Sequence, residues 1–315
     1  MTASPQAFPT RGFRLWLTGT FMTYATLKTE LDGGLLWVRL ARPDQLNAFT
    51  VEMANELEAL FRAVNTDDAV RVIIVTGEGR AFCAGMDLSR EGNVFGLNET
   101  LSPTLQEMVG RADDPVIRDG VRDTGGRVTL AIHDCDKPVI AAINGAAVGI
   151  GATMTLAMDF RLASEKARIG FVFGRLGIVP EACSTWFLPR LVGLQQALEW
   201  VYTADIVDAA EALRAGLVRS VHAPETLLAD AETFARRLIA DRSPSAVAMS
   251  RHMMRRNSAL ASPVEAHNIE SLAMLDTSRN DGREGVQAFK EKRTPVFSRA
   301  VTLPVFFRRL LGRAG

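Results

Sequence analysis

The hydrophobic pattern of the chain is organised around a short apolar run that leads into glycines and then a helix. Residues 138–143 (PVIAAI) are apolar and end at Asn144, which predicts a buried strand. Gly149 and Gly151 follow, and residues 152–158 are good helix formers. The first N–H groups of a helix have no partner within it, and glycine lets a ligand approach the backbone closely. The stretch therefore suits a ligand oxygen that carries or develops negative charge.

A second apolar run, residues 70–75 (VRVIIV), predicts another buried strand, and it leads through a turn to Gly85. Taken alone, either stretch is better explained by a tight turn that packs against a neighbouring helix than by a binding site. Residues 27–42 predict a hairpin with a glycine turn, and residues 160–163 and 169–173 predict short strands. Helical spacing of apolar residues and capping signals predict helices at 47–63, 104–109, 128–133, 182–191, 194–204, 207–215, 226–240, 244 onward, 263 onward and 283–292. At the second to last of these, Ser262 and Glu265 predict a capping box.

Composition narrows the class of protein. The 315 residues have a formal net charge of zero, which gives no reason to expect a nucleic-acid partner. The three cysteines form no paired motif, so we expect no disulfide framework and a cytoplasmic protein. The four histidines have no metal-ligand spacing, and the glycines match no dinucleotide or phosphate-binding motif, so we expect no metal and no redox cofactor.

The two ends of the chain differ from its middle. We interpret residues 1–26 as an N-terminal extension outside the fold, since their apolar run is too mixed for a signal peptide. No apolar run is long enough to predict a transmembrane segment. Residues 298–315 carry four arginines among apolar residues; a mobile basic tail is the favoured interpretation, and contact with a membrane surface or another subunit is the alternative.

The two stretches described above, together with several others in the same order, resemble the crotonase (enoyl-CoA hydratase/isomerase) superfamily. The likeness covers roughly residues 27–297, and its motifs are residues 30–50, 70–88, 137–160, 164–171, 177–193, 207–218 and 284–297. The resemblance implies an α/β fold, a spiral of strand–turn–helix units, with a C-terminal helical region that makes trimers. We accordingly expect a core that binds acyl-CoA at 27–215 and a helical trimerisation region at 216–297.

The resemblance also implies how an acyl-CoA is held. Two backbone N–H groups, those of Met86 and Ile150 by motif, would bind the thioester oxygen and stabilise the enolate that forms. Coenzyme A would be part of the substrate, and no separate cofactor is expected. Lys292 matches a basic residue that reaches the CoA phosphates, often from a neighbouring subunit; a solvated lysine is an equally good interpretation. The substrate-binding set that this motif match implies is Asp44, Gln45, Leu46, Ala84, Asp87, Leu88, Gly149, Thr153, Phe173 and Lys292.

The catalytic carboxylates of the family distinguish its reactions. Hydratase-type members use two glutamates, and this sequence has Thr153 and Phe173 at those two places. Neither residue can act as a general base near neutral pH. Glu181 remains, and we expect it to open the helix 182–191, where some Δ3,Δ2-enoyl-CoA isomerases of the superfamily carry their single base. A role as an ordinary N-terminal helix charge is the alternative.

The favoured function is therefore a single-base Δ3,Δ2-enoyl-CoA isomerase of fatty acid metabolism, with Glu181 as the proton shuttle. One alternative is an enoyl-CoA hydratase, a lyase, with a non-standard acid and base. The other is a catalytically silent acyl-CoA binding protein. The expected assembly is a homotrimer or a dimer of trimers.

Overall fold

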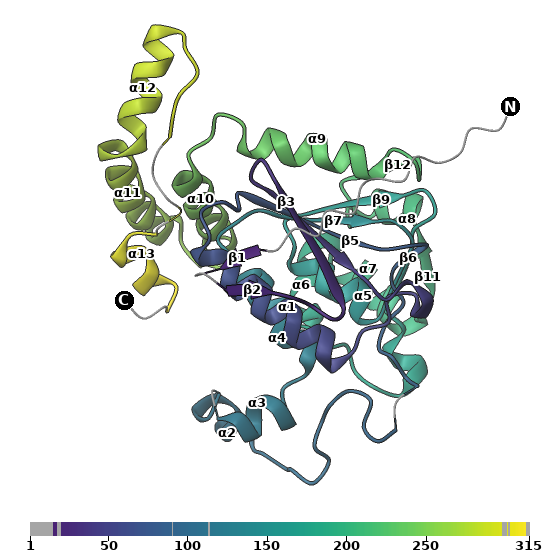
Figure 1. Cartoon of the computed structure of the whole chain (residues 1–315). Helices are drawn as coiled ribbons and strands as arrows, with labels where there is room; N and C mark the ends of the chain where they lie inside the picture. The colour runs from purple at the N-terminus through teal and green to yellow at the C-terminus, as the bar shows by residue number, and fades with distance from the viewer. Residues whose placement is uncertain are drawn as a thin grey trace, which may run out of the picture.

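The computed structural model describes residues 15–17, 20–89, 91–112, 114–297, 301 and 303–312. Its centre is a six-stranded sheet in the order β12-β9-β7-β5-β4-β3, and only β3 runs antiparallel to its neighbour (Figure 1). The strands are β3 (Leu27–Asp32), β4 (Leu35–Leu40), β5 (Val72–Gly77), β7 (Val139–Ile143), β9 (Phe160–Ser164) and β12 (Ser220–His222).

A second sheet of four short strands, in the order β11-β10-β8-β6, lies beside the first. Parallel pairs join β10 to β8 and β8 to β6, so the turns that follow β6 and β8 are neighbours. The strands are β6 (Ala81–Cys83), β8 (Ala146–Val148), β10 (Arg168–Gly170) and β11 (Ile206–Asp208). The strand predicted at 169–173 ends at Gly170, because the chain turns there into a 3-10 helix, η4 (Val172–Leu176).

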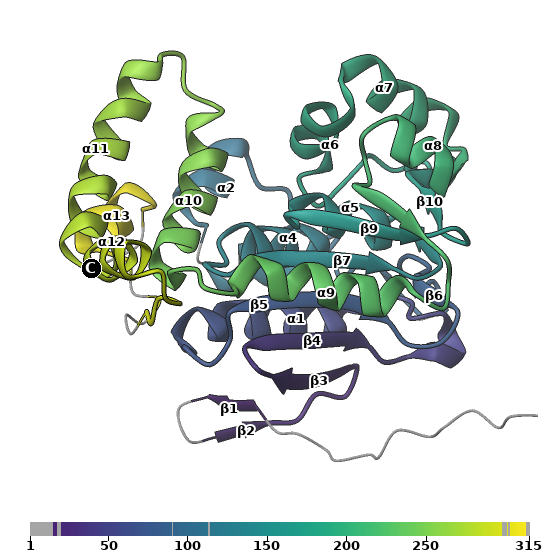
Figure 2. The ribbon, with the colours of Figure 1, turned by 90° about the horizontal axis from the view of Figure 1, so that it is seen from above.

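Helices cover both faces of the large sheet, as the alternation of strand side chains requires. Ile73 and Val75 of β5 face the core that α1 (Val51–Ala63) and α4 (Thr124–His133) complete. Val72 and Ile74 face the opposite layer, which α9 (Leu227–Ile239) covers (Figure 2). The core is therefore formed by buried strands whose side chains point alternately into two layers. The strands predicted from the apolar runs at 70–75 and 138–143 are confirmed, with bounds that differ by at most two residues.

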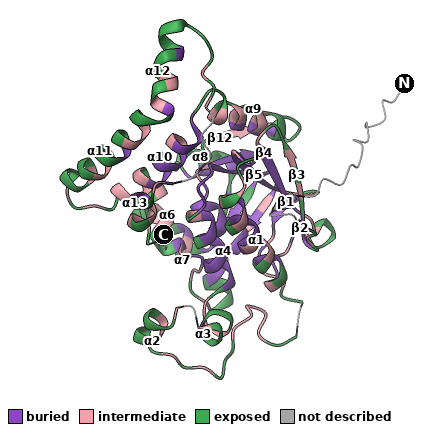
Figure 3. Cartoon of the chain, turned by 60° about the vertical axis from the view of Figure 1, so that its left-hand side comes forward, coloured by how far each residue is buried: buried purple, intermediate pink, exposed green. Residues whose placement is uncertain are grey.

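The remaining elements surround this core. The helices are α2 (Leu105–Gly110), α3 (Pro115–Gly120), α5 (Ile150–Thr153), α6 (Ser184–Val192), α7 (Leu194–Thr203), α8 (Ala209–Arg214), α10 (Pro244–Asn257), α11 (Pro263–Arg279), α12 (Asp281–Glu291) and α13 (Val305–Leu310). The other 3-10 helices are η1 (Pro43–Gln45), η2 (Val64–Thr66) and η3 (Met154–Ala157). Figure 3 shows that α2, α3, α11 and α12 are mostly exposed.

The structure corrects the expected domain boundaries. The core continues past residue 215, because β12 joins the large sheet and α9 packs on it; the separate helical region begins at α10 (Figures 1 and 2). Part of the N-terminal extension, β1 (Leu15–Leu17) and β2 (Thr20–Met22), forms an antiparallel hairpin. Ser262 caps α11 through the Val264 N–H, and no reciprocal bond from Glu265 completes a box among the described residues.

The C-terminal tail, expected to be mobile, packs against the helical region. Phe307 of α13 is fully buried with Met249 of α10 and Ala273 of α11. The Val301 N–H also donates a hydrogen bond of 3.0 Å to Asp68. Most described apolar residues of the tail therefore pack within the chain, whereas Val305 is exposed. Residues 298–300, 302 and 313–315 lie outside the described residues.

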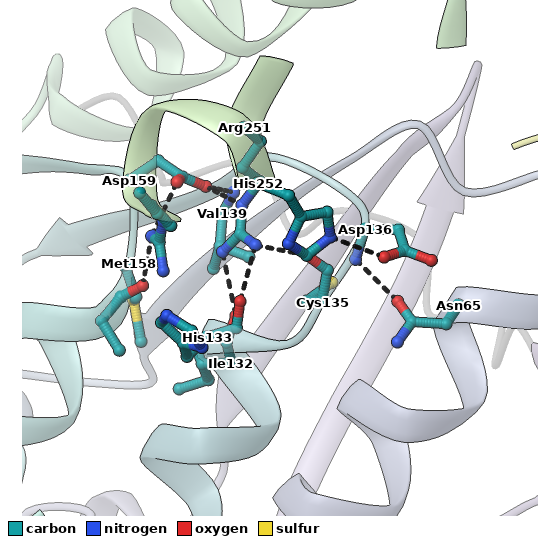
Figure 4. Close-up of polar contacts among 12 residues, drawn as sticks. Asn65, Ile132, His133, Cys135, Asp136, Val139, Met158, Asp159, Arg251 and His252 are labelled. Carbon is teal, nitrogen blue, oxygen red and sulfur yellow. Dashed lines mark hydrogen bonds and ion pairs between the residues drawn. The ribbon is translucent and has the colours of Figure 1, made fainter. Parts of the chain in front are cut away.

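A polar cluster ties α10 to the core (Figure 4). The Arg251 guanidinium donates to the Ile132 and His133 carbonyls at 2.9 Å each and to the Cys135 carbonyl. It also forms an ion pair of 2.8 Å with Asp159. These contacts satisfy carbonyls at the end of α4, which have no partners within that helix.

Candidate active site

Two glycine turns meet where β6 and β8 end. Gly85 has a φ of +104°, and a Cβ there would lie 3.1 Å from the Val148 carbonyl oxygen. A Cβ on Gly151 would lie 2.1 Å from the Cys83 carbonyl oxygen. The distance at Gly151 is one that real Cβ atoms do not reach, and L side chains rarely adopt the φ of Gly85, so glycine at both positions lets the two turns pack together.

Each turn presents a backbone N–H beside the same cavity. Met86 follows Gly85 and Ile150 is the first residue of α5, and both line the cavity. Phe49 brackets the first turn, since its N–H donates to the Gly85 carbonyl at 2.7 Å and its carbonyl accepts from Asp87 at 2.8 Å. Within the part of the chain that the structure describes, neither the Met86 nor the Ile150 N–H has a hydrogen-bond acceptor. Two unsatisfied donors at one cavity are suited to bind a ligand oxygen.

The cavity has a volume of about 340 Å³ and a largely apolar lining. Its residues come from both glycine turns, from the start of α4, from η4 and from the segment before α6. They are Ala84, Gly85, Met86, Leu88, Phe95, Asp123, Thr124, Gly125, Val148, Gly149, Ile150, Val172, Phe173, Arg175, Leu176, Ile178 and Glu181. Such a lining suits an apolar group that is attached to a polar end.

Glu181 lies at the cavity but does not open a helix, contrary to expectation. Ala182 and Cys183 have left-handed φ values of 58° and 54°, and α6 begins only at Ser184. The carboxyl group is therefore held by neighbouring side chains and not by a helix N-terminus. Thr153 donates a hydrogen bond of 2.7 Å to Glu181 Oε1.

Space for this carboxyl group depends on Gly125 in α4. A Cβ at that position would lie 1.9 Å from Glu181 Oε2. Burial raises the pKa of Glu181 to about 8; the Thr153 hydroxyl lowers it, and the charge and hydrogen bonding of Asp123 raise it further. A carboxyl group with a pKa near neutrality can both accept and return a proton at physiological pH.

Asp123 is a site residue that the sequence interpretation missed. It caps α4 by accepting a hydrogen bond from the Gly126 N–H, and it also accepts one of 3.2 Å from the Ala182 N–H. It lies in a polar, glycine-containing segment between the family motifs on which the sequence interpretation relied. Its one local signal is an aspartate three residues before a glycine within a helix, which indicates a cap but not a site.

The residues predicted to bind substrate fall into two groups. Ala84, Leu88, Gly149 and Phe173 line the cavity together with Met86, Ile150 and Glu181. Thr153 is fully buried and is not part of the lining, but its hydroxyl donates to two lining residues, Glu181 at 2.7 Å and the Gly149 carbonyl at 3.3 Å.

The second group lies outside the cavity lining: Asp44, Gln45, Leu46, Asp87 and Lys292. The Leu46 carbonyl accepts a 3.1 Å hydrogen bond from Ala84, which places η1 beside the first glycine turn. Asp87 fixes that turn: hydrogen bonds from Ser89 and then Arg42 lower its pKa to about 2, and its ion pair with Arg42 is 2.8 Å long.

Lys292 stands apart from all of these. It is exposed at the end of α12, whereas α5 and β6 lie toward the opposite side of the molecule (Figures 1 and 2). Within one chain, Lys292 therefore does not belong to the site.

Comparison with known proteins identifies the family of the chain. The family model described as enoyl-CoA hydratase/isomerase matches residues 30–117 and 101–300. The chain belongs to the enoyl-CoA hydratase/isomerase family. This crotonase-type chain is 40% identical over 266 residues to the enoyl-CoA hydratase ACTT3 of Alternaria alternata, covering 84% of this chain and 83% of that protein.

Other relatives of this enoyl-CoA hydratase/isomerase carry different names. It is 32% identical to the 1,2-epoxyphenylacetyl-CoA isomerase of Escherichia coli, covering 86% of this chain and 97% of that one. The crystal structure of an enoyl-CoA hydratase from Bacillus anthracis superposes with a TM-score of 0.74 at 32% identity, covering 86% of this chain and 98% of that one. No helix in the described part of the chain has both the length and the apolar character to cross a membrane.

Proposed function

We propose that this enzyme is a single-base Δ3,Δ2-enoyl-CoA isomerase and that Glu181 is its catalytic residue. The observation that carries the proposal is that Glu181 lines the same cavity as Met86 and Ile150, whose N–H groups lack acceptors among the described residues. In the proposed reaction the Glu181 carboxylate takes a proton from C2 of a 3-enoyl-CoA. The electron pair moves toward the thioester oxygen, and the 3,4 double bond becomes part of a dienolate.

The Met86 and Ile150 N–H groups would stabilise that oxygen. A donor of this kind contributes about 3 kcal/mol to the transition state. The protonated Glu181 then returns its proton to C4, the double bond comes to rest between C2 and C3, and the carboxylate is regenerated. The pKa of about 8 supports this cycle, because both forms of Glu181 are populated near neutral pH.

Hydration of a 2-enoyl-CoA is the second candidate, and one observation favours it. Asp123 lies beside Glu181, so the cavity offers two carboxyl groups, although neither is at the usual glutamate positions. Two such groups could orient and activate one water molecule. Relatives named hydratases also support this candidate.

Product analysis distinguishes these functions. The enzyme is incubated separately with a 3-enoyl-CoA and a 2-enoyl-CoA, and each reaction is followed by absorbance and mass. Isomerisation converts the 3-enoyl-CoA at constant mass, hydration adds one water to the 2-enoyl-CoA, and binding without turnover would indicate a silent protein. We expect Glu181→Gln to lower isomerisation by about 10²–10⁴-fold, with CoA affinity retained. Glu225→Gln, at an exposed turn, is the matched control, and undiminished turnover in Glu181→Gln would contradict the proposal.

We further propose that the nucleotide end of the substrate lies along η1 and the first glycine turn, near Asp44, Gln45 and Leu46. The exposure of Asp44 and Gln45 and the contact of Leu46 with Ala84 support this placement.

Lys292 would reach a CoA only in a neighbouring subunit of a trimer or a dimer of trimers. Exposed apolar side chains on α11 and α12, such as Met274 and Phe289, support such an assembly. Light scattering of the purified protein measures its mass directly.

A further inference from the structure

The carboxyl group of Asp123 is fixed from two directions. Its Oδ1 accepts hydrogen bonds from the Gly126 N–H, in the first turn of α4, and from the Ala182 N–H, next to Glu181. Backbone N–H groups can only donate, so both contacts suit a carboxylate oxygen. Asp123 thereby connects the start of α4 to the segment that carries Glu181.

The Glu181 carboxyl group is held against this aspartate. Thr153 binds its Oε1 at 2.7 Å, and its Oε2 lies over Gly125, two residues after Asp123. The carboxyl groups of Glu181 and Asp123 are close enough for a hydrogen bond when one of them is protonated. Two neighbouring carboxyl groups cannot both ionise without repulsion, so they interact through a shared proton.

The other titratable and charged groups near Glu181 are two thiols and two guanidinium groups. Burial raises the pKa of Cys83 to about 12, and burial also raises the pKa of Cys183, so both thiols are neutral near pH 7. Arg175 lines the cavity, but its guanidinium is more than half exposed and pairs with Asp205 at 3.3 Å. Arg122 precedes Asp123, and its guanidinium contacts the Met108 carbonyl at 3.5 Å. Among the described residues, Asp123 is thus the acidic group in direct contact with Glu181.

We propose that Asp123 is a positioning residue for Glu181: it accepts a hydrogen bond from the protonated Glu181 carboxyl and holds that group toward the cavity. The inference rests on the proposed function, since it takes Glu181 as the group that moves the substrate proton. While Glu181 carries that proton, the bond to Asp123 keeps the acid in place until C4 accepts the proton. When Glu181 is ionised, the negative charge of Asp123 makes it a stronger base.

Asp123→Asn tests this role. Asparagine caps helices about as well as aspartate, so the variant keeps the bonds to Gly126 and Ala182 while it loses the charge. We expect the acidic limb of the pH profile of kcat/KM to move down by about 0.5–1 pH unit, a modest shift because Asp123 is exposed to solvent. The infrared band of the protonated Glu181 carboxyl, identified by its loss in Glu181→Gln, should titrate at lower pH by the same amount without any substrate.

Two further variants keep the test decisive. Asp208→Asn changes an equivalent cap, on α8, and should move neither profile. Asp123→Ser also caps α4 but cannot reach Glu181, and it replaces Asp123→Asn if that variant does not fold. Unchanged activity and infrared titrations in a folded variant would overturn the proposal and leave Asp123 as a cap only. A shifted infrared titration with an unshifted activity profile would support the contact but remove Glu181 from the reaction, so the two proposals fail separately.

Discussion

Two carboxyl groups of this protein are withdrawn from most solvent, yet they have opposite surroundings. Asp159 faces two guanidinium groups, that of Arg251 at 2.8 Å (Figure 4) and that of Arg255 at 2.7 Å. Glu181 faces a hydroxyl group, from Thr153, and another carboxyl group, from Asp123. Both groups lose hydration, so the difference between them comes from their partners.

Those partners move the two pKa values in opposite directions. Burial alone would raise the pKa of Asp159, but Arg251 and Arg255 outweigh it and lower that pKa. Burial raises the pKa of Glu181, and no cation among the described residues compensates for that burial. A carboxylate that is always ionised can hold elements together, whereas one that titrates near neutrality can transfer protons.

Removal of the structural carboxylate should have the largest effect on stability. Asp159→Asn leaves Arg251 and Arg255 buried beside a neutral partner, so we expect a loss of about 3–5 kcal/mol in the free energy of unfolding. Urea titration measures this loss. The matched control is Lys28→Met, which breaks the exposed 2.8 Å pair with Glu78 and should cost at most about 1 kcal/mol. Equal losses in both variants would show that the Asp159 ion pairs stabilise the fold no more than the exposed Lys28–Glu78 pair does.

A methyl group at residue 125 should displace the Glu181 carboxyl group and thereby lower activity. The new Cβ of Gly125→Ala would overlap Glu181 Oε2 and come within 2.4 Å of Ile150 Cδ1. Displacement of a reacting group by about 1 Å can cost about 10²-fold in rate, and we expect a loss of that order in kcat/KM. Gly110→Ala in α2 is the control, since nothing lies within 4 Å of its Cβ. Turnover that matches the control would mean that kcat/KM does not depend on the position of the Glu181 carboxyl group.

The raised pKa of Glu181 also predicts how stability depends on pH. Between the ordinary pKa of 4.5 and the folded value of about 8, the folded state holds one more proton than the unfolded state at this residue. The contribution of Glu181 to stability is therefore present at low pH and is lost as pH rises through about 8. Glu181→Gln removes this dependence, so its stability relative to wild type should increase from about pH 5 to about pH 8. A constant difference across that range, in urea titrations, would show that Glu181 has an ordinary pKa.

The smallest predicted change is at Thr153, whose hydroxyl lowers the pKa of Glu181. Thr153→Val keeps the shape of this buried residue and removes the hydroxyl, so the acidic limb of kcat/KM should move up by about one pH unit at most. That direction is opposite to the one expected for Asp123→Asn. Pre-steady-state or steady-state rates from about pH 6 to 10 measure both, and shifts of the same sign would contradict this arrangement.

Much of the fold could be predicted from the sequence because its signals are local. The runs at β5 and β7 are apolar and bounded, and Gly85, Gly149 and Gly151 mark turns that allow close backbone approach. The family motifs then led to the two glycine turns and to Glu181, which line one cavity. These features depend on residues close together in the chain.

The missed features depend on contacts between distant segments. Asp123 lies in a segment without a periodic pattern, and only the fold brings it to Glu181, 58 positions later. The left-handed residues Ala182 and Cys183 delay α6, although their side chains give no turn signal. The buried face of α13 is likewise visible only once Phe307 is seen to meet α10 and α11.

The measurement that tests the central claim most directly is the pH profile of kcat/KM for a 3-enoyl-CoA in wild type and in Glu181→Gln. If the carboxyl group at the cavity moves the proton, the wild-type kcat/KM rises with pH through an apparent pKa near 8. In Glu181→Gln this acidic limb disappears and kcat/KM falls by at least about 100-fold. A limb that persists unchanged in Glu181→Gln would assign the proton transfer to another group.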